Sequence, residues 1–389
     1  MKEKRATSLI FAIMVLDLLG AGILLPILPY YVRAYRTDAL TVGLLSLAFS
    51  AAQFLSSPAL GAVSDRIGRR PVLLWSIFGS AAGYFLFGLA GSLWMLFAAR
   101  LLDGVTGGNI STAQAYLADI SAPGDRARNF GLVGAAWGIG FVAGPALGGA
   151  LAGFGLAAPA FGAGVCSLLT FAAAYLFLPE SLPSARRAQS GVTLAAVNPF
   201  RQLAWGIRHA SLAPVLAAVF LFHFPMAGLQ SNFSLFTLEK FAFTPSDNAW
   251  AFVFLGVMVS LLQGLILRRF VKDFGKTAYL YLGLWIMAAG YVVLAFSPNV
   301  AILYVSMVLT ALGSSLAAPT LTALVSQCVP EDQQGAALGV NQSVLSLTRV
   351  AGPVWAGWLF DVWGPPAPYW TAVFWLGCAL LLISARRGR

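Results

Sequence analysis

Charge is scarce in this sequence of 389 residues. Only 10% of the residues are Asp, Glu, Lys or Arg, against the roughly 25% found in soluble globular proteins. There are two histidines and three cysteines, and the cysteines have no CxxC spacing. No group of His, Cys or carboxylate residues has the spacing of a metal site or a catalytic nucleophile, so we predict neither an enzyme nor a cofactor. Cys166, Cys328 and Cys378 lie in or beside apolar segments, and we expect them to be packing residues.

Long apolar runs are what the sequence has instead, since 59% of its residues are hydrophobic. A run of about twenty apolar residues can cross the hydrocarbon core of a bilayer as a helix. The first run is too long and too rich in Gly and Pro for a cleaved signal peptide. The sequence therefore predicts an all-α integral membrane protein with twelve transmembrane helices, at approximately 8–31, 42–63, 71–91, 93–118, 128–152, 159–179, 211–237, 247–267, 277–296, 300–326, 335–360 and 367–385.

The net charge of +10 comes from basic residues whose positions along the chain follow a membrane topology. If the N-terminus is cytoplasmic, most Lys and Arg residues fall in the tails and in the even-numbered loops. Of the basic residues outside the helices, Arg33, Arg36 and Lys240 fall on the other side. This asymmetry is the positive-inside rule, and it predicts that both termini are cytoplasmic. We therefore expect the basic residues to set the orientation in the bilayer, and we expect no nucleic-acid partner.

An internal repeat divides the chain. VAGPA at 142–146 matches VAGPV at 350–354, and Gly68 in DRIGRR matches Gly275 in KDFGKT at almost the same offset. A stretch rich in Pro, Ser and Arg lies between the halves. Two similar halves imply a pseudo-two-fold axis along the membrane normal and a substrate path between the halves. We predict an N-terminal six-helix bundle at 1–180, a cytoplasmic linker at 181–210 and a C-terminal six-helix bundle at 211–389.

The loop after the second run reads GAVSDRIGRRPVLL from Gly61 to Leu74. Topology alone accounts for arginines here, but their fixed order is more specific. The loop resembles the signature G-x-x-x-D-R-x-G-R-R of the major facilitator superfamily. The resemblance implies a cytoplasmic latch that holds the outward-open state. Its gating residues would be Gly61, Asp65, Arg66, Gly68, Arg69 and Arg70, with Asp119 as the expected partner of one arginine.

The first run carries a carboxylate in DLLGAGILLPILP. Asp17 lies about ten residues into the membrane segment, where a carboxylate is costly unless it is paired, protonated or facing water. The Gly and Pro residues after it permit close packing and kinks. The spacing D-x-x-G-x-G-x-x-x-P-x-x-P resembles the twelve-helix drug:proton antiporter branch of the superfamily.

The fifth run contains GIGFVAGPALGG. Small residues at this spacing predict a close helix contact. The run also resembles the antiporter motif G-x-x-x-x-x-G-P-x-x-G-G, which implies a bend and a seal. Both interpretations make the same residues helix-packing residues: Gly138, Gly144, Pro145, Gly148 and Gly149.

In the fourth run, five positions share one narrow helix face at about 100° per residue. They hold Arg100, Asp103, Gly107, Ser111 and Gln114, which predicts a polar stripe facing a cavity. The segment RLLDGVTGGNISTAQAYLADI resembles tetracycline exporters, in which an arginine is followed by a GITG-like turn. This match is good in the N-terminal half of the chain and weak in the C-terminal half.

We predict that Asp17, Asp103 and Arg100 couple protons to transport. Arg100 and Asp103 are one helical turn apart and can form an ion pair, whereas Asp17 has no basic neighbour in its own helix and is the better proton carrier. Two alternatives stay open. Arg100 either alternates between Asp103 and Asp17, or it forms a permanent clasp with Asp103 while Asp17 alone titrates.

The C-terminal half departs from tetracycline exporters. Val259 and Met287 stand approximately where those exporters carry His and Asp, and Gly83 precedes Tyr84 where they carry an acidic residue. We therefore expect weak or absent tetracycline export. His223 is a lone histidine in an apolar run, and such a residue is often a hydrogen-bonded core residue. Arg349 at mid-depth, by contrast, needs a counter-charge or a ligand. The predicted substrate-cavity residues are Gln53, Ser111, Gln114, His223, Gln230, Asn232, Asn341, Gln342 and Arg349.

Together these patterns predict a proton-coupled exporter of small lipophilic or cationic organic compounds. It would work by alternating access as a monomer in the cytoplasmic membrane of a bacterium, with small molecules and protons as its partners. The alternative is a proton-coupled symporter of a nutrient or metabolite with the same fold.

Overall fold

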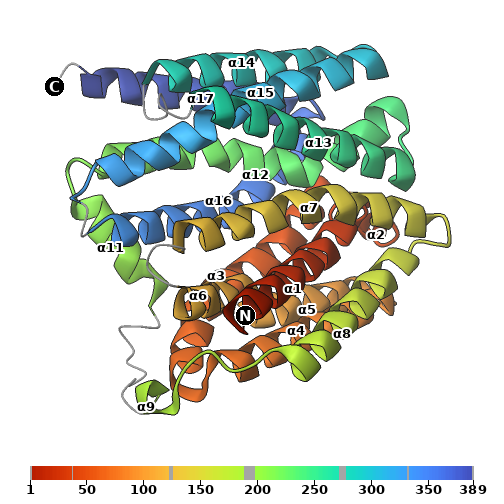
Figure 1. Cartoon of the computed structure of the whole chain (residues 1–389). Helices are drawn as coiled ribbons and strands as arrows, with labels where there is room; N and C mark the ends of the chain where they lie inside the picture. Colours follow the sequence, from red (N-terminus) through yellow and green to blue (C-terminus); the bar gives the residue numbers. More distant parts are fainter. Residues whose placement is uncertain are drawn as a thin grey trace. The chain divides into compact units, whose positions relative to one another are not determined.

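The computed structural model describes residues 2–36, 38–121, 126–187, 198–270, 277–330 and 333–387. Gly275 of the internal repeat and the middle of the predicted linker lie outside these ranges. The described residues form helices and short connections, and they contain no β-strand (Figure 1). The predicted all-α fold class is confirmed.

The helices follow the predicted apolar runs closely. The first half contains α1 (Lys2–Leu24), α2 (Leu28–Arg33), α3 (Ala39–Ile67), α4 (Arg69–Gly88), α5 (Leu93–Thr106), α6 (Asn109–Ile120), α7 (Arg126–Ala152) and α8 (Ala158–Phe177). Two short helices follow, α9 (Ser184–Arg187) and α11 (Pro199–Arg208). The second half contains α12 (Ala213–Phe241), α13 (Pro245–Phe270), α14 (Thr277–Phe296), α15 (Val300–Gln327), α16 (Gln334–Trp363) and α17 (Ala367–Arg387).

Ten helical segments of the described chain are long and apolar enough to cross a membrane, with α1 and α2 counted as one. The other two predicted spans are the pair α5 and α6 and the long helix α16. The pair α5 and α6 is divided into two short helices, and α16 carries polar side chains such as Asn341, Gln342 and Arg349 along its length. These two spans complete the predicted set of twelve.

The fourth span is broken, and our prediction of one continuous helix there is wrong. α5 ends at Thr106 and α6 begins at Asn109, so Gly107 and Gly108 form the break. Glycine is a poor helix former, and two in succession weaken the helix further. Two carbonyl groups at the end of α5 accept hydrogen bonds from α3: the Gln53 Nε2 donates to the Gly107 oxygen at 2.8 Å, and the Ser56 Oγ donates to the Gly104 oxygen at 3.2 Å.

Contacts divide the chain into two compact units. The first unit comprises Met1–Arg36, Ala48–Pro199 and Thr244–Val253, and the second comprises Thr37–Leu47, Phe200–Phe243 and Phe254–Arg389. The first turns of α3 therefore belong to the second unit, and the first turns of α13 belong to the first unit. The bundle and linker boundaries drawn from the sequence stay predictions.

Small residues bring α7 against α1 in the first unit. A β-carbon at Gly144 would lie 2.7 Å from the Gly22 Cα, and one at Gly140 would lie 2.7 Å from the Leu18 Cβ. Gly148 has no room for a β-carbon because the backbone of Ile23 lies against it. The glycines of the fifth span therefore serve close packing, and Pro145 lies inside the same helix. Of the other predicted packing residues, Gly149 contacts Ala249 of α13, and Gly138 is half-buried.

The second unit repeats this arrangement with α12 and α16. A β-carbon at Gly352 would lie 2.6 Å from the Phe224 oxygen and 3.0 Å from the Gly228 nitrogen. Pro353 follows Gly352 inside α16, as Pro145 follows Gly144 inside α7. The repeated VAGP sequence thus corresponds to a repeated helix contact, and the two six-helix bundles are pseudo-symmetric.

A carboxylate anchors the start of α3 within the second unit. Asp361, near the end of α16, accepts hydrogen bonds from the Ala39 and Leu40 amides, each at 2.8 Å. A carboxylate at a helix N-terminus satisfies otherwise unpaired N–H groups and stabilises the helix dipole. Gly357 permits the approach, because a β-carbon there would lie 2.6 Å from the Ala39 oxygen.

Candidate functional site

An ion pair is buried inside the first unit. The Arg100 Nη2 lies 3.1 Å from the Asp103 Oδ2, one helical turn along α5. Arg100 is 8% exposed and Asp103 3% exposed. Asp103 also accepts a hydrogen bond from the side chain of Ser80 on α4. Each buried charge here has a partner, which is what keeps two charges tolerable away from water.

Aromatic rings surround the guanidinium group of Arg100. Its carbon lies 5.1 Å from the ring centre of Phe87, 5.3 Å from that of Phe49 and 5.9 Å from that of Tyr84. Its Nε forms no hydrogen bond with any group in the described part of the chain. Ring faces attract a cation electrostatically, more strongly when the cation is desolvated. Arg100 is therefore held by one carboxylate and by three rings from α3 and α4.

Gly83 lies directly against the ion pair. A β-carbon at Gly83 would lie 3.0 Å from the Asp103 Cβ and 3.2 Å from the Ala99 oxygen. One turn earlier on α4, Gly79 has no room for a β-carbon because Thr106 lies against it. A side chain at position 83 would therefore crowd Asp103 and the Ala99 oxygen, where α4 and α5 are in contact.

The second carboxylate of the first unit, Asp17, lies half-buried on α1. The Asn109 Nδ2 donates a hydrogen bond to the Asp17 Oδ1 at 2.6 Å, and Asn109 is 6% exposed. Our reasoning from the sequence missed Asn109. The available signal was an asparagine directly after two glycines, a position where a helix restarts.

The predicted polar stripe is not continuous, because the break at Gly107 and Gly108 ends the regular helical spacing. Ser111 is exposed and donates to the Gly108 oxygen at 2.9 Å, while Gln114 is half-buried. Arg100 and Asp103 stay together on α5, and Gln53 hydrogen-bonds the break itself. The roles of Gln53, Ser111 and Gln114 in a cavity stay predictions.

Arg69, the first residue of α4, is the centre of the polar contacts where α3 ends and α4 begins. Its guanidinium group contacts the Asp65 Oδ1 at 2.5 Å, the Asp119 Oδ2 at 3.1 Å and the Ser64 Oγ at 2.6 Å. Asp119 thus lies beside an arginine of the loop, as expected. Arg66 is exposed, and Gly61 is half-buried with open space where a β-carbon would lie.

Glu180 organises the same loop and was missed in the sequence. Its carboxylate accepts hydrogen bonds from the amides of Arg69, at 2.9 Å, and Arg70, at 3.2 Å, at the N-terminus of α4. Gly68 has φ +114°, a conformation that favours glycine, and a β-carbon there would also displace the Glu180 carboxylate. The Arg70 Nη2 donates to the backbone oxygen of Tyr175 at 2.6 Å.

The predicted cavity residues of the C-terminal half lie on α12 and α16 of the second unit. The His223 Nδ1 lies 3.0 Å from the Val219 oxygen, and its ring packs edge-on against Phe222. Asn232 and Asn341 are buried, Gln230 is half-buried, and Gln342 and Arg349 are exposed. Their function as substrate ligands stays a prediction.

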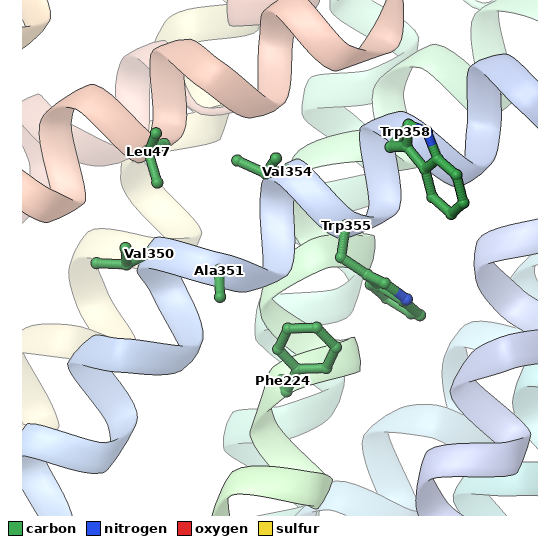
Figure 2. Close-up of a pocket in the computed structure, with 7 residues that line it drawn as sticks. All are labelled: Leu47, Phe224, Val350, Ala351, Val354, Trp355 and Trp358. Carbon is green, nitrogen blue, oxygen red and sulfur yellow. The ribbon is translucent and has the colours of Figure 1, made fainter.

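An apolar cavity of about 470 Å³ lies in the second unit (Figure 2). Leu47 of α3 and Phe224 of α12 face five residues of α16, namely Val350, Ala351, Val354, Trp355 and Trp358. The ring centres of Phe224 and Trp355 are 4.9 Å apart. None of the polar residues predicted to bind substrate lines this cavity.

Comparison with known proteins identifies the class. The sequence model of the Major Facilitator Superfamily matches residues 10–274 and 215–386, so the chain belongs to this superfamily. It is a multi-pass membrane protein of a transporter family, and the resemblance drawn from its motifs is confirmed.

Three similar proteins illustrate the range of the family. The tetracycline resistance protein, class C, of Escherichia coli is 32% identical, with 100% of this chain and 98% of that protein covered. Multidrug resistance protein 2 of Bacillus subtilis (strain 168) is 31% identical, with coverages of 88% and 86%. The crystal structure of the human organic anion transporter MFSD10 (TETRAN) has 26% identity, a TM-score of 0.75 and coverages of 98% and 99%.

Proposed function

We propose that this protein is a proton-coupled exporter of small lipophilic or cationic organic compounds. It works by alternating access in the cytoplasmic membrane of a bacterium, with both termini in the cytoplasm. The observation that carries this proposal is the pair of carboxylates in the first unit. Asp103 is held by Arg100, whereas Asp17 has a neutral amide, that of Asn109, as its hydrogen-bond partner within the described ranges. Intramembrane carboxylates of this kind mark proton pathways.

The two carboxylates differ in what protonation would cost. Protonation of Asp103 would leave the buried Arg100 without a counter-charge, which is expensive away from water. Protonation of Asp17 breaks no ion pair, and it removes a negative charge that lies within electrostatic reach of Asp103. Asp17 is therefore the group that takes up and releases the proton, and uptake from outside would drive the substrate outward.

The printed names of two relatives, a tetracycline resistance protein and a multidrug resistance protein, support export of small organic molecules. The local structure argues against tetracycline. Met287 of α14 is an apolar residue that is 1% exposed, and its backbone lies against Gly313 of α15. Val259 is apolar as well. Broad apolar selectivity fits the content of Phe and Trp.

A resistance and uptake panel tests the proposed substrate class. In a bacterial strain that lacks its own pumps, expression should lower accumulation of at least one hydrophobic cationic dye and give weak or absent tetracycline resistance. The Asp17→Asn variant, at equal expression, is the control for proton coupling. Strong magnesium-dependent tetracycline resistance would contradict the expected selectivity.

The alternative function is a proton-coupled symporter, and organic anions are the alternative substrate class. MFSD10 is named as an organic anion transporter, and Arg349 is an exposed cationic side chain on α16. Oriented membrane vesicles distinguish the alternatives. Export by antiport predicts that dye moves against the direction of the imposed proton flux, whereas symport predicts movement with it.

Asp65 carries the gating part of the proposal, in which the loop between α3 and α4 is a latch. Asp65→Asn should reduce transport by about tenfold or more while expression and dye binding stay at the parental level. Loss of the ion pair to Arg69 should cost less than about 1 kcal/mol of stability, because the Asp65 side chain is 48% exposed. Transport and binding are measured on the same vesicles. Equal turnover of variant and parent would remove Asp65 from the latch.

A further inference from the structure

Asn109 joins two features of the first unit. Among the described residues, it is the side chain that hydrogen-bonds Asp17, with 2.6 Å between the Nδ2 and the Oδ1. It is also the first residue of α6, directly after the break in the fourth span. A change at Asp17 therefore reaches the break through one side chain.

The break between α5 and α6 is closely packed, and the motion left to it is rotation of the backbone at Gly107 and Gly108. Gly107 and Gly108 have no side chains, and α3 fills the space beside them: a β-carbon at Gly107 would lie 2.9 Å from the Gln53 Nε2, and one at Gly108 would lie 2.5 Å from the Leu60 Cδ1. The end of α5 is fixed to α3 by the hydrogen bond from Gln53. The start of α6 has no side-chain cap of its own, so its first fixed polar contact is the one that Asn109 makes with α1.

A carboxamide can recognise both states of a carboxyl group. Ionised Asp17 only accepts hydrogen bonds, and the Asn109 Nδ2 supplies a donor. Protonated Asp17 has an O–H to donate, and the Asn109 Oδ1 has no hydrogen-bond partner in the described part of the chain. A turn of the amide group presents this oxygen instead. When the amide turns, the Oδ1 gains a hydrogen bond from the protonated carboxyl group and the Nδ2 gives up its acceptor, so each state of Asp17 pairs with a different end of the amide.

We propose that Asn109 senses the protonation state of Asp17 and passes it to the break between α5 and α6. Asn109 is thus a positioning residue for proton coupling. This inference rests on the proposed function, in which Asp17 carries the proton. When Asp17 takes up a proton, the amide of Asn109 reorients and the first turn of α6 shifts at Gly107 and Gly108.

The other groups that face Asp17 are less suited than Asn109 to sense its protonation state. α8 presents the Cys166 thiol, which contacts the Leu16 oxygen at 3.6 Å, and α4 presents Tyr84. α5 contributes Asp103, already paired with Arg100. Residues 132–152 of α7, the helix most closely packed on α1, contain no titratable side chain. Among the described residues of these elements, Asn109 of α6 is the one whose side chain forms a hydrogen bond with Asp17, and its amide can both donate and accept.

Infrared spectroscopy tests the first step with the proton itself as the probe. In the purified full-length protein in lipid nanodiscs, the C=O band of protonated Asp17 is identified as the band that Asp17→Asn removes. Asn109→Leu keeps the side-chain volume but lacks the amide, so the carboxylate loses a donor. The ionised form loses a charge-assisted hydrogen bond, which is stronger than the neutral one that the protonated form loses. The midpoint of the band's pH titration should therefore move up by about one unit, a tenfold change in proton affinity. Asn109→Ala is the second variant if the leucine variant does not fold.

Hydrogen exchange of residues 107–117 tests the second step. In the parent protein, exchange of this segment should change as Asp17 titrates, and in Asn109→Leu this change should vanish. Asn129→Ala is the matched control, because Asn129 is equally buried in the same unit and donates one hydrogen bond, to the Ser121 Oγ at 2.7 Å. It should leave both readouts unchanged.

The outcomes separate the two claims. Equal titration midpoints in the parent and in the Asn109 variants would overturn the role of Asn109 and leave Asp17 as proton carrier. Equal shifts in Asn129→Ala and Asn109→Leu would reveal a general loss of structure and would also overturn it. If Asp17→Asn removes no C=O band at any pH, Asp17 does not take up a proton, and this result would contradict the proposed function itself.

Discussion

Replacing Asp17 with Asn should abolish transport driven by a pH gradient. The amide has the shape of the carboxyl group but cannot take up or release a proton, and the hydrogen bond with Asn109 can still form. Folding should therefore be retained while coupling is lost. The measurement is uptake of a hydrophobic cationic dye into inverted vesicles with an imposed pH gradient. Dye exchange without a gradient should persist, and this separates lost coupling from lost binding.

Asp103→Asn separates the two roles left open for Arg100. If Arg100 alternates between carboxylates, the variant frees the guanidinium group to hold Asp17 in its ionised form. More acid is then needed to protonate Asp17, so the pH profile of transport moves to lower pH. If Arg100 and Asp103 form a permanent clasp, the profile stays where it is. In that case only expression and stability fall, by about 3 to 5 kcal/mol for a broken buried pair.

Gly144→Val should have the second large effect, on folding. A β-carbon at Gly144 would lie 2.7 Å from the Gly22 Cα and 2.9 Å from the Leu19 oxygen, and both are backbone atoms that cannot move aside. α1 and α7 would have to separate along the whole row of glycine contacts. We expect a loss of about 3 kcal/mol, at the upper end of what overpacking costs, and a marked fall in the amount of folded protein.

The matched control is Gly134→Val on the same helix. Gly134 is exposed and has open space where its β-carbon would lie. The Gly134→Val substitution changes the helix propensity by the same amount, but its side chain collides with no backbone atom. Thermal unfolding of both variants in detergent measures the difference. Equal unfolding temperatures would mean that the close approach of α1 and α7 does not limit stability.

The apolar runs located the helices well because hydrophobic length is a local property. The predicted segment 277–296 coincides with α14, and 300–326 differs from α15 by one residue. The Arg100–Asp103 pair was equally accessible, since its members are one turn apart in one helix. Helix packing by Gly144 and Gly148 was also predictable from their spacing.

What the sequence could not reveal depends on pairs of residues far apart in the chain. Asn109 and Asp17 are separated by 92 positions, and Glu180 and the Arg69 amide by 111. No spacing rule connects such residues, because α1, α4, α6 and α8 come together only in the folded bundle. The break at Gly107 was missed for a different reason: a run of apolar residues predicts length, and it does not report where a helix is interrupted.

The interrupted fourth span has a consequence for the biogenesis of the protein. As it leaves the ribosome, the segment that becomes α5 and α6 presents Arg100, Asp103 and a helix break to the translocon. Each such charge at the centre of a helix opposes insertion by roughly 2.5 to 3.5 kcal/mol. Ser80, which hydrogen-bonds Asp103, and Gln53, which hydrogen-bonds the break, lie on α4 and α3, and both helices are synthesised first. Insertion of the fourth span therefore depends on the two spans before it. Defects in those earlier helices would appear first as a failure of the fourth span to insert.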